Sequence, residues 1–165
     1  MKRVNAGHHE AIYRVARYYF MGEMYGLRQD KAEGLRWHDR AIEAGSGDAA
    51  YNIGNIYLNG DGVEQDHVRA FEYFQKAAKL GDIHAFLQVG HVLLSKGEIE
   101  EGMLNYRKAA ICGMSEDSLF DLLRNGCRDG FITKEEYAFT LRENQKACNE
   151  INSEGREMWK EMLSD

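Results

Sequence analysis

The feature that most constrains the fold of this chain is an internal repeat. Residues 49–57 are echoed by residues 85–93 at a shift of 36, and residues 13–19 fit the same template. A second segment recurs with it, at residues 34–45, 70–81 and 102–113. Repeats of this length are single supersecondary units that bury their apolar faces only by stacking on a neighbour. The chain is therefore expected to form a linear array.

Both segments have the period of a helix with one buried face. In the first segment, small or apolar residues stand at i, i+3, i+4 and i+7: Ala50, Ile53, Gly54 and Tyr57. In the second segment the corresponding stripe is Ala70, Phe74 and Ala77. The sequence thus predicts an all-α fold, a right-handed α-α superhelix (solenoid) of stacked helix-turn-helix repeats, with no sheet.

Helix boundaries must be marked without proline, which the chain lacks. Gly45, Gly81 and Gly113 each follow a second helix, where glycine takes the left-handed conformation without a side-chain penalty. Side-chain N-caps are expected at four positions: Asp30, Asp66, Asp82 and Ser115. The first helices carry a small residue at one shared register, namely Ala16, Gly54 and Gly90, which predicts close approach of the two helices of a pair.

The second repeat carries a specific motif, A-x-Y-x-x-G-x-x-Y-x-x-G-x-G-V-x-x-D over residues 49–66, followed by A-x-x-Y-x-x-K-A-A-x-x-G over residues 70–81. This motif resembles the Sel-1-like repeat, a relative of the tetratricopeptide repeat. The first repeat departs from it at Met24 and Tyr25, and the third lacks the G-x-G-V loop. The resemblance implies a protein-protein interaction module.

The repeats predict one domain over residues 1–165. Its parts are three repeats at about residues 9–45, 46–81 and 82–113, a degenerate capping repeat at 114–150, and a helix or tail at 151–165. Helices are expected at 118–124 and 133–149 within the cap, whose outer face is polar because it has no further neighbour. The last segment contains Trp159 and Met162.

Composition excludes several classes of function. A net charge of −6 and a pI near 5.5 disfavour binding to nucleic acid or to a membrane surface, because those partners select basic patches. Cys112, Cys127 and Cys148 show no metal or disulfide spacing, so free thiols are expected. Without a signal peptide or an apolar span, the sequence favours a cytoplasmic location.

Residues 125–136 partly overlay the calcium loop of an EF-hand. It fails at two early ligand positions: Asn125 offers only one carbonyl oxygen, and Cys127 is a soft thiol where a hard cation prefers oxygen, while the cationic Arg128 adds repulsion. Thr133 with Glu136 is better explained as a capping box that starts a helix. The sequence therefore predicts a structural role for this loop and no metal site.

No other metal or catalytic constellation is predicted. His8 and His9, and likewise His84 and His91, are pairs without the further ligands that tetrahedral zinc requires. No nucleophile elbow, phosphate loop or dinucleotide fingerprint occurs. We expect a chain that is not an enzyme and has no cofactor.

A peptide groove is predicted from the first helices, which line the concave side of such arrays. Its candidate residues are Tyr13, Arg14, Arg17, Phe20, Tyr51, Asn52, Asn55, Leu58, Asn59, Gln88, His91 and Leu94, with Ser95 beside them. The i, i+3 pairs at one register would form a ladder of hydrogen-bond donors: Arg14 and Arg17, Asn52 and Asn55, Gln88 and His91. The ladder could hold a carboxylate or a peptide backbone.

Three function hypotheses follow. The first is an adaptor or scaffold that binds a segment of another protein, possibly acidic, in the groove. The second is a structural accessory subunit docked in a larger complex through its convex face or its C-terminal helix. The third is a weakly calcium-responsive or hydrolytic protein, for which the sequence offers the least support. Neither the partner nor the oligomeric state follows from the residues.

Overall fold

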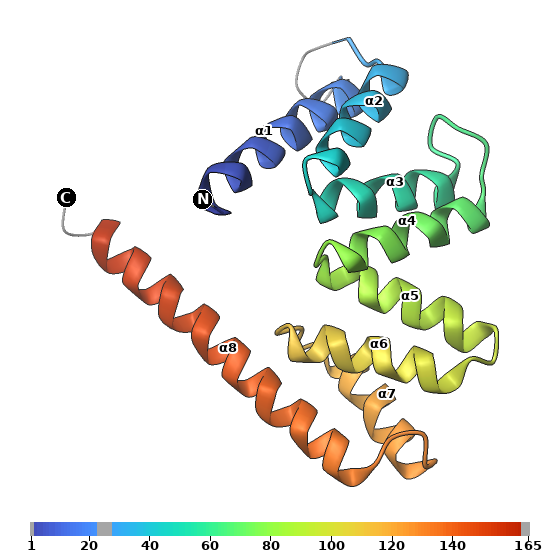
Figure 1. The fold of residues 1–165 in the computed structure, drawn as a ribbon, viewed down its shortest axis with the longest axis vertical. Helices are drawn as coiled ribbons and strands as arrows, with labels where there is room; N and C mark the ends of the chain where they lie inside the picture. The colour runs from blue at the N-terminus through green and yellow to red at the C-terminus, as the bar shows by residue number, and fades with distance from the viewer. Residues whose placement is uncertain (1, 23–27, 163–165) are drawn as a thin grey trace. The chain divides into compact units, whose positions relative to one another are not determined.

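The computed structural model describes residues 2–22 and 28–162, and the side chains of residues 9–22 and 28–151. These residues form eight helices and no strand, as the sequence predicts (Figure 1). The helices are α1 (Lys2–Met21), α2 (Lys31–Glu43), α3 (Gly47–Asn59), α4 (His67–Lys79), α5 (Ile83–Ser95), α6 (Ile99–Ile111), α7 (Asp117–Arg128) and α8 (Lys134–Met162). Met24 and Tyr25, and the side chains of His8, Trp159 and Met162, lie outside the described residues.

The chain divides into two compact units, an N-terminal unit (Met1–Val89) and a C-terminal unit (Gly90–Asp165). In the N-terminal unit, α1 packs on α2, α2 on α3, and α3 on α4. Small residues dominate the buried cluster between these pairs, which consists of Ala41, Ile42, Ala49, Ala50, Ile53, Ala77 and Ala85. In the C-terminal unit, α6 packs on both α7 and α8.

The shared small register is confirmed as a close contact between paired helices. A Cβ added at Gly54 would lie 2.6 Å from Cε1 of Phe74, and one at Gly90 would lie 2.6 Å from Cε1 of Tyr106. Ala16, at the same register of the first repeat, is fully buried. The small residue therefore makes room for an aromatic ring of the second helix.

The predicted helix ends are confirmed. Gly45, Gly81 and Gly113 have φ values of 98°, 92° and 98°. At each end the glycine N–H and the next N–H donate to the last turn, as from Gly45 to Ile42 and from Ser46 to Ala41 at 2.9 Å each. This pattern is a Schellman closure, which satisfies the orphan carbonyls.

Three of the four predicted N-caps are confirmed. The carboxylates of Asp30, Asp66 and Asp82 accept backbone N–H groups of α2, α4 and α5. The fourth prediction, Ser115, is wrong because α7 begins two residues later, at Asp117. Its first turn is closed by backbone bonds to the carbonyl of Glu116, without a side-chain cap.

Hydrogen bonds from polar side chains of α8 connect the helices of the C-terminal unit. Asn144 donates to the carbonyls of Ala110 and Met114 at 2.7 and 2.9 Å, so its buried amide fixes the end of α6. The helices predicted at 118–124 and 133–149 are present within α7 and α8, but α8 continues without a break to Met162. Residues 151–162 thus extend the same helix.

Candidate binding cleft

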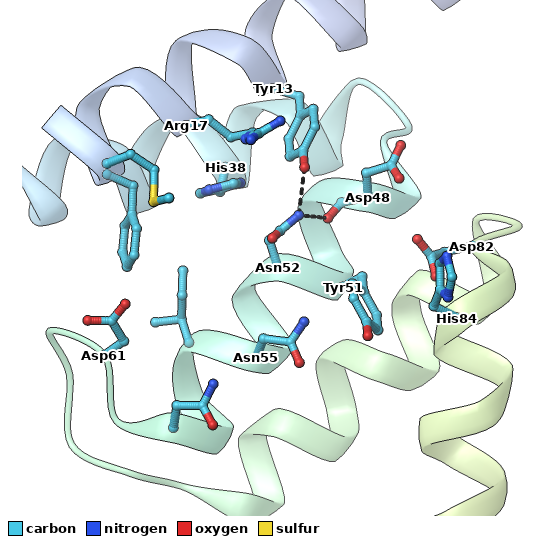
Figure 2. A pocket seen from close by; sticks show the side chains of 14 residues that line it. Tyr13, Arg17, His38, Asp48, Tyr51, Asn52, Asn55, Asp61, Asp82 and His84 are labelled. Atoms are coloured by element: carbon cyan, nitrogen blue, oxygen red, sulfur yellow. Dashed lines mark hydrogen bonds between the residues drawn. The ribbon is translucent and has the colours of Figure 1, made fainter. Parts of the chain in front are cut away.

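A cleft of about 500 Å³ lies in the N-terminal unit, between α1, α2, α3 and the start of α5 (Figure 2). We call it the α1–α3 cleft. Seven of its fourteen lining residues are among the predicted groove residues: Tyr13, Arg17, Phe20, Tyr51, Asn52, Asn55 and Asn59. The other seven are Met21, His38, Asp48, Ile56, Asp61, Asp82 and His84.

The remaining predicted residues lie elsewhere. Arg14 does not line the cleft and pairs with Glu10 at 3.1 Å. Leu58, Gln88 and Leu94 are half-buried and do not line the cleft, while the exposed His91 belongs to the C-terminal unit. Phe20, one of the predicted groove residues, is a core residue that is 7% exposed where it lines the cleft.

One hydrogen bond joins the first two repeats across the cleft. The amide of Asn52 donates to the hydroxyl of Tyr13 at 2.8 Å and to the carbonyl of Asp48 at 2.8 Å (Figure 2). With both N–H groups used, the amide of Asn52 retains only its oxygen as an acceptor. Because the hydroxyl of Tyr13 accepts from Asn52, its proton is left to donate. Burial raises the pKa of Tyr13, so this proton is retained at neutral pH.

His38 is a cleft residue that the sequence analysis missed. Its side chain is 2% exposed and lies between the rings of Tyr13 and Phe20, at centroid distances of 5.8 and 6.3 Å. Burial, reinforced by the charge of Arg17, lowers the pKa of His38 to about 4, so the ring is neutral at pH 7. Its Nδ1 atom is buried without a hydrogen-bond partner.

Alignment of the three repeats shows from the sequence that His38 is unusual. Residues 34–45, 70–81 and 102–113 align position by position, so His38 occupies the place of Phe74 and Tyr106. In those repeats the position is a fully buried aromatic ring. A polar ring at a core position of the template marks the first repeat as different.

The charges lining the cleft are mixed. Arg17 lies on one wall, with its guanidinium carbon 5.9 Å from the ring centre of Tyr13. Three carboxylates line other parts: Asp61, which pairs with Lys31 at 2.5 Å, Asp48, and Asp82. The pKa of Asp82 is raised, mainly by burial and also by repulsion from Asp48. The cleft can therefore accept hydrogen bonds at several points but offers one guanidinium.

The loop that resembles an EF-hand has the predicted capping role. The N–H of Thr133 donates to Oε2 of Glu136 at 2.9 Å, and the N–H of Glu136 donates to the hydroxyl of Thr133 at 3.1 Å. Oε1 of Glu136 accepts from Arg107 at 2.5 Å. The carboxylate at the last ligand position is thus engaged within the protein.

The described residues contain no group of three or more His, Cys, Asp or Glu placed to hold a metal ion. Cys112, Cys127 and Cys148 are free thiols. Over the same residues, no helix is both long and apolar enough to cross a membrane.

Comparison with known proteins identifies the repeats. The sequence model of the Sel1 repeat matches residues 9–46 and 47–82, which confirms the resemblance seen in the sequence. Chitin synthase regulatory factor 4 of Schizosaccharomyces pombe is 30% identical over 111 residues, covering 67% of this chain and 17% of that protein. The ERAD-associated E3 ubiquitin-protein ligase component HRD3B of Arabidopsis thaliana is 33% identical over 92 residues, covering 55% and 14%. The chain therefore spans less than a fifth of the length of these two relatives.

Solved structures share the fold. A Sel1 repeat protein from Oxalobacter formigenes matches 87% of this chain and 60% of its own, with a TM-score of 0.62 and 23% identity. The protein c5321, a protective antigen of uropathogenic Escherichia coli strains with an SLR fold, matches 82% of this chain and 30% of its own, with a TM-score of 0.61 and 22% identity.

Proposed function

This chain carries Sel1 repeats, and we propose that it is an adaptor or scaffold that binds a segment of a partner protein in the α1–α3 cleft. Sel1 repeats form a protein-interaction fold that is not itself catalytic, and fold alone does not define a site. The observation that carries the proposal is the bond between Asn52 and Tyr13, which links two repeats across a cleft lined with amides and rings.

The cleft chemistry suits an extended peptide. Asn55 and Asn59 follow Asn52 along α3 and also line the cleft, so each can offer both a donor and an acceptor to a peptide backbone. Tyr51, whose ring lies 5.9 Å from that of His84, and Phe20 supply apolar surface for side chains. An acidic group of the partner would be held beside Arg17.

The names of the relatives agree with such a role. They include a chitin synthase regulatory factor and a component of a ubiquitin ligase, both named for action within a larger system. We extend to this chain only the part that fits the cleft, which is the holding of another polypeptide.

The test is binding of partners captured from native extract and then purified. We expect Asn55→Ala to weaken binding about fivefold to tenfold, because a cleft hydrogen bond contributes about 1 kcal/mol. The matched control is Asn125→Ala, which removes the same amide from an exposed position of α7. Equal loss in both variants, or no loss in Asn55→Ala, would contradict binding in the cleft.

A second candidate function is supported by exposed apolar side chains of the C-terminal unit. Phe131, Phe139, Leu141 and Ile151 are between 40% and 57% exposed. Three of them lie on α8, which favours an accessory subunit docked through that helix. If this candidate is correct, Phe139→Glu with Leu141→Glu abolishes partner capture while Asn55→Ala leaves it unchanged.

A further inference from the structure

We propose that Tyr13, Arg17 and His38 form a subsite of the α1–α3 cleft that recognises a single carboxylate of the partner, with His38 taking up a proton when the carboxylate binds. The inference rests on the proposed peptide-binding function and adds the chemistry of the group bound. It is carried by a buried polar side chain at a position that the other repeats fill with a phenyl or phenol ring.

The comparison between repeats shows that His38 is not needed for packing. Phe74 and Tyr106 fill the equivalent position and lie against Gly54 and Gly90. The hydroxyl of Tyr106 also finds a partner, Nδ1 of His91, at 2.9 Å. Nδ1 of His38 has none. An unsatisfied buried polar atom is unfavourable, and a ligand that supplies its partner recovers that cost.

The register also places a cation beside this histidine. His91 and Arg17 occupy equivalent positions of the third and first repeats, so the pair of Tyr106 with His91 corresponds to His38 with Arg17. Figure 2 shows Arg17, Tyr13 and His38 on the same side of the cleft. Arg17 and the donating hydroxyl of Tyr13 provide N–H and O–H donors, and the ring of His38 provides a third. Three donors favour an oxyanion.

A carboxylate bound here would change the protonation of His38. Burial and Arg17 hold the pKa of His38 at about 4 in the free protein. An adjacent negative charge raises the pKa of a histidine by about 1 to 3. The proton is taken up on binding, so affinity for a carboxylate rises as the pH falls toward 5. The other charged or titratable groups that line the cleft are Tyr13, Arg17, Asp48, Asp61, Asp82 and His84, and Asp61 is paired with Lys31.

The other cleft charges restrict the partner further. Asp48, Asp61 and Asp82 line the cleft on the remaining sides, so a polyacidic segment would meet repulsion. The preferred segment therefore has one carboxylate, flanked by neutral or basic residues.

The experiment uses the full chain with isotope-labelled histidine and asparagine, and two capped pentapeptides. Both have alanines with one terminal lysine, and they differ only in aspartate or asparagine at the centre. We expect the aspartate peptide to shift the ring signals of His38 toward the protonated form and to bind about five- to tenfold tighter at pH 5 than at pH 7.5. The asparagine peptide should show neither effect. The signals of His67, exposed and outside the cleft, are the internal control.

A variant separates recognition from packing. Ala16→Gly combined with His38→Phe copies the pair that the second repeat already contains, Gly54 with Phe74, and so preserves the core. It should fold, as circular dichroism will show, and bind the aspartate peptide with the same affinity at pH 5 and pH 7.5, because Arg17 and Tyr13 keep their contacts to the carboxylate but no ring takes up a proton. A five- to tenfold gain in affinity at pH 5 in this variant would overturn the proposal.

The outcomes also separate this inference from the proposed function. If both peptides shift the signals of Asn52 and Asn55 equally and leave His38 unchanged, the cleft binds peptides but the carboxylate subsite is wrong. If neither peptide shifts any cleft signal, the subsite and the peptide-binding function both fail.

Discussion

The first and second repeats solve the same packing problem with different side chains. In the second, Gly54 leaves room for the fully buried ring of Phe74. In the first, Ala16 replaces the glycine and the smaller imidazole of His38 replaces the phenyl ring. The added methyl group and the smaller ring compensate in volume, but the exchange places a polar, titratable group under the cleft. The comparison shows how a repeat can place a titratable group at a core position without losing its helices.

The largest expected effect is a loss of stability caused by overpacking the second repeat. Gly54→Leu adds a side chain whose Cβ alone would lie 2.6 Å from the buried ring of Phe74. Overpacking of this kind costs about 1 to 3 kcal/mol, and we expect a value near the upper end of that range because the ring is enclosed. Urea denaturation measures the loss. Asn125→Leu, exposed on α7, should lose little, and equal stability of the two variants would refute the packing register.

The next effect is a pH dependence of stability that comes from His38 of the first repeat and has no counterpart at Phe74 of the second. The pKa of His38 is lowered to about 4 from 6.5. Between these values the unfolded chain holds more protons than the folded chain, so the free energy of unfolding falls as the pH falls. From pH 8 to pH 5 the loss attributable to His38 is about 2 kcal/mol.

The control for this pH dependence is the variant Ala16→Gly with His38→Phe, which keeps every other titratable group. Its free energy of unfolding should fall by about 2 kcal/mol less over the same pH range. Urea denaturation of both proteins at pH 8 and pH 5 gives the difference. Parallel losses would mean that His38 is not buried in the neutral form.

The smallest expected loss of stability comes from a substitution that gives the third repeat the phenyl ring found in the second. Tyr106→Phe removes the bond to Nδ1 of His91 and retains the ring that lies against Gly90. Since His91 is exposed and water can replace its partner, we expect a loss of about 0.5 kcal/mol, at the low end for a hydrogen bond. Thermal denaturation measures it. A loss several times larger would show that the hydroxyl, and not the ring, holds this pair together.

Helix ends and buried helix faces could be predicted from the sequence, because both depend on residues close together in the chain. A glycine that directly follows the last turn of a helical pattern takes the left-handed conformation that closes the helix, so Gly45, Gly81 and Gly113 could be placed from sequence alone. The helical period likewise located the buried registers. The N-cap predicted at Ser115 was wrong because the start of α7 depends on how the segment after buried Met114 packs, and tertiary packing is not readable from local sequence.

The candidate site was only partly accessible from sequence. The polar first-helix positions indicated Asn52 and Asn55, but neither the bond of Asn52 to Tyr13 nor the burial of Phe20 follows from spacing. His38 lies on a second helix, whereas the groove was predicted from first helices only. Alignment of the repeats identifies it, because His38 is a polar residue at a position where the other two repeats have Phe74 and Tyr106.

The carboxylate of Glu136 has a consequence for local opening of the chain. It binds the N–H of Thr133 at the start of α8 and, through its other oxygen, Arg107 of α6. The first turn of α8 therefore cannot fray without also losing a contact to α6. Amide hydrogen exchange in that turn should then report on the docking of α8 against α6, and the two events should share one opening free energy.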